Sequence, residues 1–152
     1  MAEMQELYQE VLLDHYKRPR NYYKLTDANR TVEGYNPLCG DHIFVYLRLE
    51  NNKIKDVSFE GSGCAISKAS ASLMTESVKG KSVEEAEALF EKFHDMVTTE
   101  PGKDVSTEAL GKLAIFIGVR EYPSRVKCAI LSWHTLKAGL SQNQASGSVS
   151  TE

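Results

Sequence analysis

The sequence of 152 residues has no two cysteines separated by two residues, so the short C-x-x-C motifs of zinc ribbons and redox proteins are absent. Its three cysteines are an odd number, which excludes a disulfide framework that pairs them all. No apolar run reaches the roughly 20 residues of a membrane-spanning helix, and the acidic N-terminus does not resemble a signal peptide. We therefore expect a cytoplasmic protein without a membrane partner, in a compartment where thiols stay reduced.

The chain also has little net charge. A net charge of −3 gives no excess of basic residues, so we expect no nucleic-acid partner. The content of 41% hydrophobic and 26% charged residues is typical of a globular protein. A chain of this length buries roughly 70% of its unfolded surface, so it needs no metal or disulfide merely to fold. We expect one domain over residues 1–140 and a disordered polar tail over residues 141–152.

Hydrophobic periodicity predicts an α+β fold. Strict alternation over residues 42–50 indicates a half-buried strand, Asn51-Asn52 is typical of a hairpin turn, and residues 53–60 form the next strand. A further short strand fits near residues 30–33. Helices are predicted before Pro19, from Cys64 to Gly80, from the capping box Ser82–Glu85, over residues 107–116, and from Ser124 to about residue 140. This order places a hairpin or three-stranded antiparallel meander under helices on one face.

Cys39, Gly40 and Asp41 place a thiol and a carboxylate two residues apart in a turn-like run. Residues i and i+2 of an extended segment point to the same face, and the glycine lets the backbone bend toward a shared ion. The tripeptide is equally compatible with a buried structural cysteine beside a turn aspartate. His42 falls on the opposite face of the predicted strand from Asp41.

The other two cysteines come at predicted helix starts. Cys64 follows Gly61-Ser62-Gly63, whose two glycines allow a close approach of the backbone to another segment, for which the Cys39 loop is the candidate. Cys128 follows the candidate N-cap Ser124. A helix N-terminus stabilises a thiolate. The alternatives are a small residue packed at a strand-to-helix corner for Cys64 and a buried apolar thiol for Cys128.

Three thiols and Asp41 make the four ligands that a tetrahedral zinc requires. With all four deprotonated, such a site carries a net charge of about −2, so it favours helix N-termini and cations nearby. Arg125 and Lys127 flank Cys128 in the sequence. The spacing of the cysteines cannot by itself show that the four residues converge.

Four runs carry a family resemblance: Asp14–Asn21, Asn36–Asp41, Gly63–Ser67 and Val78–Ser82. Together with the three cysteines, they resemble the IscU/NifU-N family, the U-type proteins of iron–sulfur cluster assembly. The likeness extends over nearly the whole chain up to the tail. It implies a small three-stranded antiparallel sheet with helices packed on one face, and a zinc site formed by Cys39, Asp41, Cys64 and Cys128.

Lys127 indicates the branch of the family. The IscU type has a Leu-Pro-Pro-Val-Lys stretch and a histidine directly before the third cysteine. Here Lys127 stands at the histidine position, and residues 118–126 do not contain that stretch. These features, and the long segment between the second and third cysteines, are similar to the SufU type. The resemblance then implies a zinc-dependent sulfur acceptor that serves a cysteine desulfurase of the SufS type and downstream iron–sulfur assembly proteins.

We expect Cys39 to accept the sulfur, because it lies on a turn whereas Cys64 and Cys128 lie at helix starts. Arg125 would stabilise the anionic site or guide docking. Two other hypotheses stay open. The three cysteines could hold a transient [2Fe–2S] cluster as an assembly scaffold. Alternatively, the zinc could only stabilise an interaction module that carries out no thiol chemistry.

Overall fold

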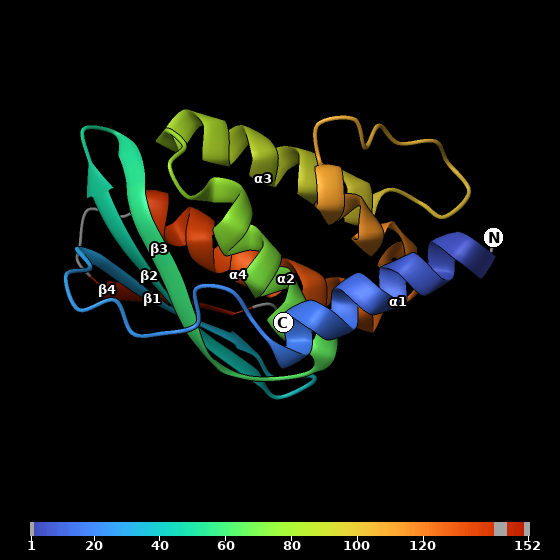
Figure 1. The fold of residues 1–152 in the computed structure, drawn as a ribbon, viewed down its shortest axis with the longest axis horizontal. Helices are drawn as coiled ribbons and strands as arrows, with labels where there is room; N and C mark the ends of the chain where they lie inside the picture. Colours follow the sequence, from blue (N-terminus) through green and yellow to red (C-terminus); the bar gives the residue numbers. More distant parts are fainter. Residues whose placement is uncertain (1, 142–145, 151–152) are drawn as a thin grey trace.

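The structure, a computed structural model, describes residues 2–141 and 146–150 as a β-sheet packed against helices (Figure 1). The elements follow in the order α1 (Ala2–Lys17), β1 (Arg30–Asn36), β2 (Asp41–Glu50), β3 (Lys53–Ser62), α2 (Ala65–Val78), α3 (Val83–Thr98), η1 (Gly111–Glu121), α4 (Pro123–Ser141) and β4 (Ser146–Ser150). Among the residues described, no helix has the length and apolarity needed to cross a membrane.

The sheet has four strands in the order β3-β2-β1-β4, so the prediction of three antiparallel strands is wrong in number and direction. β1, β2 and β3 pair antiparallel as predicted, and Asn51 and Asn52 both have the positive φ of a tight hairpin turn. β4 pairs parallel with β1.

The fourth strand comes from the segment whose composition predicts disorder. Residues 146–150 form β4, and Ser141 is the last residue of α4. The strand is defined by its backbone pairing with β1. Because its serine and glycine residues give no alternating apolar pattern, the sequence carries no signal for this strand. Residues 142–145 and 151–152 of the predicted tail lie outside the described residues. The domain boundary at residue 140 stays a prediction.

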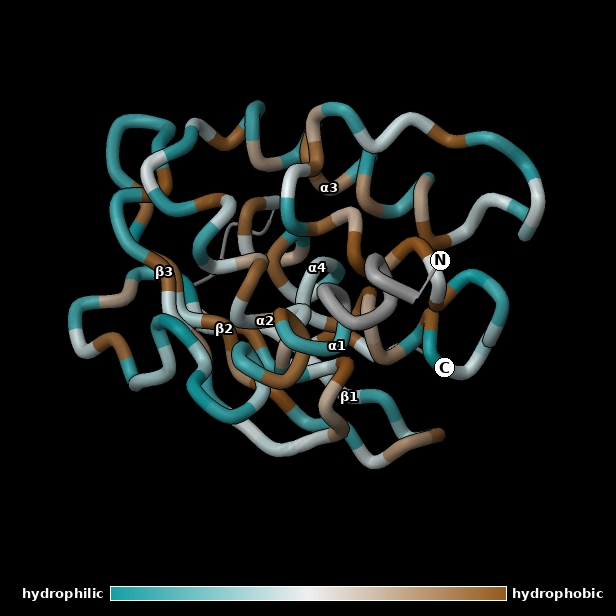
Figure 2. The backbone as a smooth tube through the Cα atoms, turned by 45° about the vertical axis from the view of Figure 1, so that its right-hand side comes forward, coloured by the Kyte–Doolittle hydropathy of each residue, from teal (hydrophilic) through white to brown (hydrophobic). Residues whose placement is uncertain are grey.

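The core lies between the sheet and the helices. Ile43, Val45 and Leu47 of β2 are buried on one face, as the alternation predicts. Phe93 of α3 stacks on Trp133 of α4 with the ring centroids 4.8 Å apart. Figure 2 shows hydrophobic residues gathered where strands meet helices, and hydrophilic residues on the outlying loops. The helices thereby hold one face of the sheet in a fixed position.

Two helix predictions had different outcomes. The capping box is confirmed, since Ser82 Oγ accepts the Glu85 N–H and Glu85 Oε1 accepts the Ser82 N–H. The helix predicted over residues 107–116 is instead the 3₁₀ helix η1, which begins at Gly111. Gly111 has φ +54°, a left-handed conformation that a right-handed α-helix cannot pass through.

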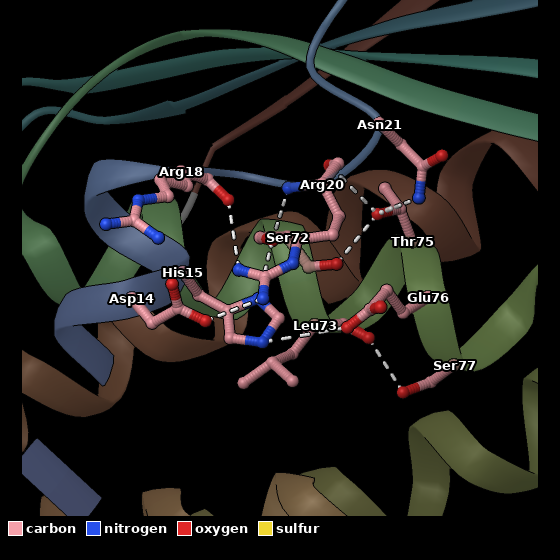
Figure 3. Close-up of polar contacts among 10 residues, drawn as sticks. All are labelled: Asp14, His15, Arg18, Arg20, Asn21, Ser72, Leu73, Thr75, Glu76 and Ser77. Atoms are coloured by element: carbon pink, nitrogen blue, oxygen red, sulfur yellow. Dashed lines mark hydrogen bonds and ion pairs between the residues drawn. The ribbon is translucent and has the colours of Figure 1, made fainter. Parts of the chain in front are cut away.

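A polar cluster around the buried His15 attaches α1 to α2 (Figure 3). His15 is 1% exposed, and its Nδ1 lies 2.7 Å from Ser72 Oγ. The same hydroxyl accepts the backbone N–H of Arg20 at 2.8 Å, and the Arg20 guanidinium donates to Asp14 at 2.6 Å. The end of α1 and the chain beyond it are therefore fixed against α2 by the His15 side chain and the Arg20 backbone, which both contact Ser72.

Acidification is expected to destabilise the fold through His15. Burial lowers the pKa of His15, and the charge of Arg20 lowers it further. The unfolded chain takes up this proton near pH 6.5, and the folded chain only at lower pH, so stability falls as the pH drops below about 6.5. His15→Gln should reduce the pH dependence of the unfolding free energy, measured by urea titration between about pH 5 and 7.5.

His134 is the internal comparison, because burial also lowers its pKa. His134→Gln should remove a separate part of the same acid sensitivity. An unchanged pH dependence in His15→Gln would contradict the role assigned to His15.

Candidate metal centre

The hairpin between β1 and β2 carries the first part of the site. Gly40 has φ +75°, and its N–H donates to the Asn36 carbonyl at 2.9 Å, which closes the turn. Asn36 and Asp41 pair across the two strands, and both are fully buried. Cys39 lies on the turn and is exposed. The local fold thus buries a carboxylate while presenting a thiol to solvent two residues away.

Cys39, Asp41 and Cys128 meet at this hairpin. The two sulfurs and a carboxylate oxygen lie within 4.8 Å of one another, and the sulfurs are 3.4 Å apart. Zinc bonded to sulfur at about 2.3 Å places its ligand atoms about 4 Å from each other, so the separations fit one shared ion. Cys128 comes from α4 and is 2% exposed. Residues from distant parts of the sequence thus converge at one point.

Cys64 lies beside this group without joining it. It is the N-cap of α2, as the predicted helix start requires, and its Sγ accepts the Ser67 N–H at 3.4 Å. Its backbone N–H donates to Asp41 Oδ1 at 2.9 Å. Its side chain is exposed, and its sulfur does not belong to the described group within 4.8 Å. Cys64 is thus attached to Asp41 through its backbone.

Two glycines allow the end of β3 to approach the hairpin closely. A Cβ atom on Gly63 would lie 2.6 Å from Asp41 Oδ1. Gly61 has φ +144°, and a Cβ there would collide with the backbone carbonyl of His42. The close approach to the Cys39 loop that the glycines predict is therefore present.

The group is short of positive charge. Burial raises the pKa of the Cys128 thiol far above its usual range, and the neighbouring Cys39, Asp41 and Cys64 raise it further. Cys128 lies in the second turn of α4, where the field of the helix N-terminus has weakened, so the predicted stabilisation by a helix start applies to Cys64 alone. A bound cation would lower the pKa of the Cys128 thiol and so stabilise its thiolate form.

Three flanking residues make other contacts. The Arg125 guanidinium stacks over the Tyr122 ring at 4.7 Å. Lys127 lines a cavity beside β4. His42 Nε2 lies 3.0 Å from Glu33 Oε1, and His42 lies on the sheet face opposite to Asp41, as the alternation predicts. A role of Arg125 at the site stays a prediction.

Asn36 is the residue that sequence reasoning did not single out. Its Nδ2 lies 3.2 Å from Asp41 Oδ2 and 3.6 Å from Cys128 Sγ. The only signal in the sequence is its place at the start of the Asn36–Asp41 run.

Comparison with known proteins identifies the family. The sequence profile described as NifU-like N terminal domain matches residues 7–129. The chain belongs to the NifU-like N-terminal domain family.

Relatives of this NifU-like chain cover almost its full length. It is 41% identical over 144 residues to the zinc-dependent sulfurtransferase SufU of Bacillus subtilis, covering 94% of this chain and 95% of that protein. It is 38% identical to the iron–sulfur cluster assembly scaffold protein IscU of Streptococcus pyogenes, covering 94% and 88%. A crystal structure from Fervidobacterium islandicum, named for iron–sulfur cluster assembly in the SUF system, has a TM-score of 0.79 at 38% identity, covering 86% and 94%.

Gly63→Ala is expected to weaken metal binding, because the added methyl group would displace the Asp41 carboxylate. Zinc affinity of the purified protein, measured by competition with a chromogenic chelator, should fall at least several-fold. Gly118→Ala is the matched control, since a Cβ there meets no atom within 4 Å. Equal zinc affinities for the two variants would show that the position of Asp41 does not depend on Gly63.

Proposed function

We propose that this NifU-like protein is a zinc-dependent sulfur acceptor in iron–sulfur cluster assembly, located in the cytoplasm. The observation that carries the proposal is the convergence of an exposed thiol, Cys39, with the buried Asp41 and Cys128 within 4.8 Å. The likeness to a protein named zinc-dependent sulfurtransferase over almost the full length supports it. The partner would be a cysteine desulfurase of the SufS type, which supplies sulfur as a persulfide.

Zinc suits the ligand atoms that are present. Two thiolates and one carboxylate oxygen are ligands that zinc accepts in tetrahedral sites. Cys64 would supply the fourth ligand, because its backbone is already fixed on Asp41. When bound, zinc would keep the thiols deprotonated at neutral pH and offset the negative charge of the group.

Cys39 is the thiol best placed to accept sulfur. Cys128 is buried, so a partner cannot reach it without opening the fold. Cys64 is exposed, but its sulfur caps α2, and a reaction there would remove a hydrogen-bond acceptor from the helix N-terminus. Cys39 lies on a turn outside any helix or strand. Its reaction therefore disturbs the least structure.

The transfer itself is a thiol exchange. The Cys39 thiolate attacks the outer sulfur of the persulfide on the desulfurase, and a new sulfur–sulfur bond forms at Cys39 Sγ. The persulfide bond of the partner breaks at the same time, and its cysteine leaves as a thiolate. One thiolate replaces another, so the step needs no external oxidant or reductant. Arg125, exposed beside Tyr122, would guide docking of the partner.

A second function, cluster assembly scaffolding, is favoured by two relatives. The Streptococcus pyogenes and Thermotoga maritima proteins are both named iron–sulfur cluster assembly scaffold proteins, at 38% and 42% identity. Cysteine thiolates are also the usual ligands of such clusters.

Anaerobic reconstitution separates the two functions. A stable cluster that passes to an apo-ferredoxin supports the scaffold, whereas zinc that iron cannot displace supports sulfur acceptance.

Cys39→Ser should abolish sulfur acceptance while leaving the fold intact, because the exposed turn contributes little to the core. The measurement is the mass gain of one sulfur atom after incubation with a cysteine desulfurase and cysteine, followed by thiol trapping. His42→Gln, on the opposite sheet face, should gain sulfur like the wild type. Persulfide found on Cys64 or Cys128 of Cys39→Ser would contradict the assignment.

A further inference from the structure

Asn36 lies between two residues of the metal centre that come from different elements. Asp41 begins β2, and Cys128 lies in the second turn of α4. The Asn36 amide nitrogen is 3.2 Å from Asp41 Oδ2 and 3.6 Å from Cys128 Sγ. An amide carries two N–H hydrogens, so one group can donate to both atoms at once.

Packing of β1 against α4 fixes this arrangement. Gly34 lies two residues before Asn36 on the same face of β1, and a Cβ there would overlap the Thr135 hydroxyl of α4. Thr135 lies two helical turns beyond Cys128. The missing side chain at Gly34 lets α4 approach the strand, and this approach brings Cys128 within reach of the Asn36 amide.

The two neighbouring acceptors determine which way the amide points. A carboxylate oxygen and a cysteine sulfur both accept hydrogen bonds, so the NH₂ group faces them and the amide oxygen faces away. That oxygen is buried without a hydrogen-bond partner among the described residues. An unpaired buried carbonyl is unfavourable, so this orientation leaves the hydrogen bonding of the amide oxygen unsatisfied. The orientation instead provides hydrogen bonds to Asp41 Oδ2 and Cys128 Sγ.

We infer that Asn36 is a positioning residue, which holds the Asp41 carboxylate and the Cys128 sulfur in place for a metal ion by donating one hydrogen bond to each. The inference rests on the proposed zinc site. Asn36 does not itself bind the ion in this orientation, because the lone pair of its amide nitrogen is delocalised and its oxygen, the atom that could be a ligand, faces away. Donors behind metal ligands orient them, and their loss typically weakens metal binding about 10–100-fold.

Asn36→Ala tests the inference through zinc affinity and through the spectrum of the cobalt-substituted protein. Zinc affinity, measured by chelator competition, should fall about 10–100-fold. The thiolate-to-cobalt charge-transfer band should move to longer wavelength, because Cys128 loses a donor that lowers the energy of its lone pair. Asn36→Ser keeps one donor that can serve only one acceptor, so its zinc affinity should lie between those of Asn36→Ala and the wild type.

Asn29→Ala is the matched control. Asn29 lies directly before β1, and its side chain makes two hydrogen bonds of 2.8 Å with the backbone of Leu49. Its loss should lower the stability of the fold and leave zinc affinity and the cobalt spectrum unchanged. If Asn36→Ala likewise lowers only stability, the residue is merely structural and the inference is overturned.

Failure of the inference is distinguishable from failure of the proposed function. A wild-type protein that does not bind zinc overturns the zinc-dependent function. A wild-type protein that binds zinc tightly, with Asn36→Ala binding equally well, overturns only the positioning role. If Asn36→Ala does not fold, zinc affinity and the cobalt spectrum are measured on Asn36→Ser instead. Wild-type values of both in Asn36→Ser would overturn the positioning role of Asn36.

Discussion

The buried carboxylate of Asp41 is the constraint on which the site depends. It is fully buried, and both of its oxygens accept hydrogen bonds, from the Cys64 backbone and from the Asn36 amide. Burying an ionised carboxylate costs several kcal/mol unless such partners and a counter-charge are present. Because the two hydrogen-bond donors to Asp41 are Asn36 and Cys64, the end of β1 and the start of α2 meet at the start of β2. Gly63 has no side chain because that point has no room for one.

Hydrogen bonds alone do not balance the charge at this point. Burial raises the pKa of Cys128, and the neighbouring Cys39, Asp41 and Cys64 raise it further, so this position disfavours a thiolate. Neither Arg125 nor Lys127, the cations adjacent in the sequence, has a described hydrogen bond or ion pair with the group. Lys127 is one residue from Cys128 on α4 and therefore points about 100° away from it, and the Arg125 guanidinium stacks over the Tyr122 ring instead. In the proposed function, a cation shared by the two sulfurs and the carboxylate oxygen would supply the counter-charge.

The sequence predicted those features that side-chain patterns determine. The alternation of β2, the capping box at Ser82 and the helix start at Cys64 each have a local cause, and all three are present. Features determined by backbone pairing or by three-dimensional packing were not predictable. β4 pairs through its backbone, and the contact of Asn36 with Cys128 spans 92 residues. The convergence of Cys39 and Cys128 was not predictable either, because the spacing of residues in a sequence carries no information about their distance in space.

The attachments of the three cysteines differ, and this difference bears on the proposed thiol chemistry. Cys128 is held inside α4, and Cys64 caps α2 with its sulfur. Cys39 lies on a turn closed by a bond between the backbones of Gly40 and Asn36, so its sulfur can move without breaking a helix or a strand. A zinc that only stabilised an interaction module would gain nothing from exposing one ligand on such a turn, since exposure invites exchange and oxidation. A thiol that must meet a partner's sulfur requires that exposure.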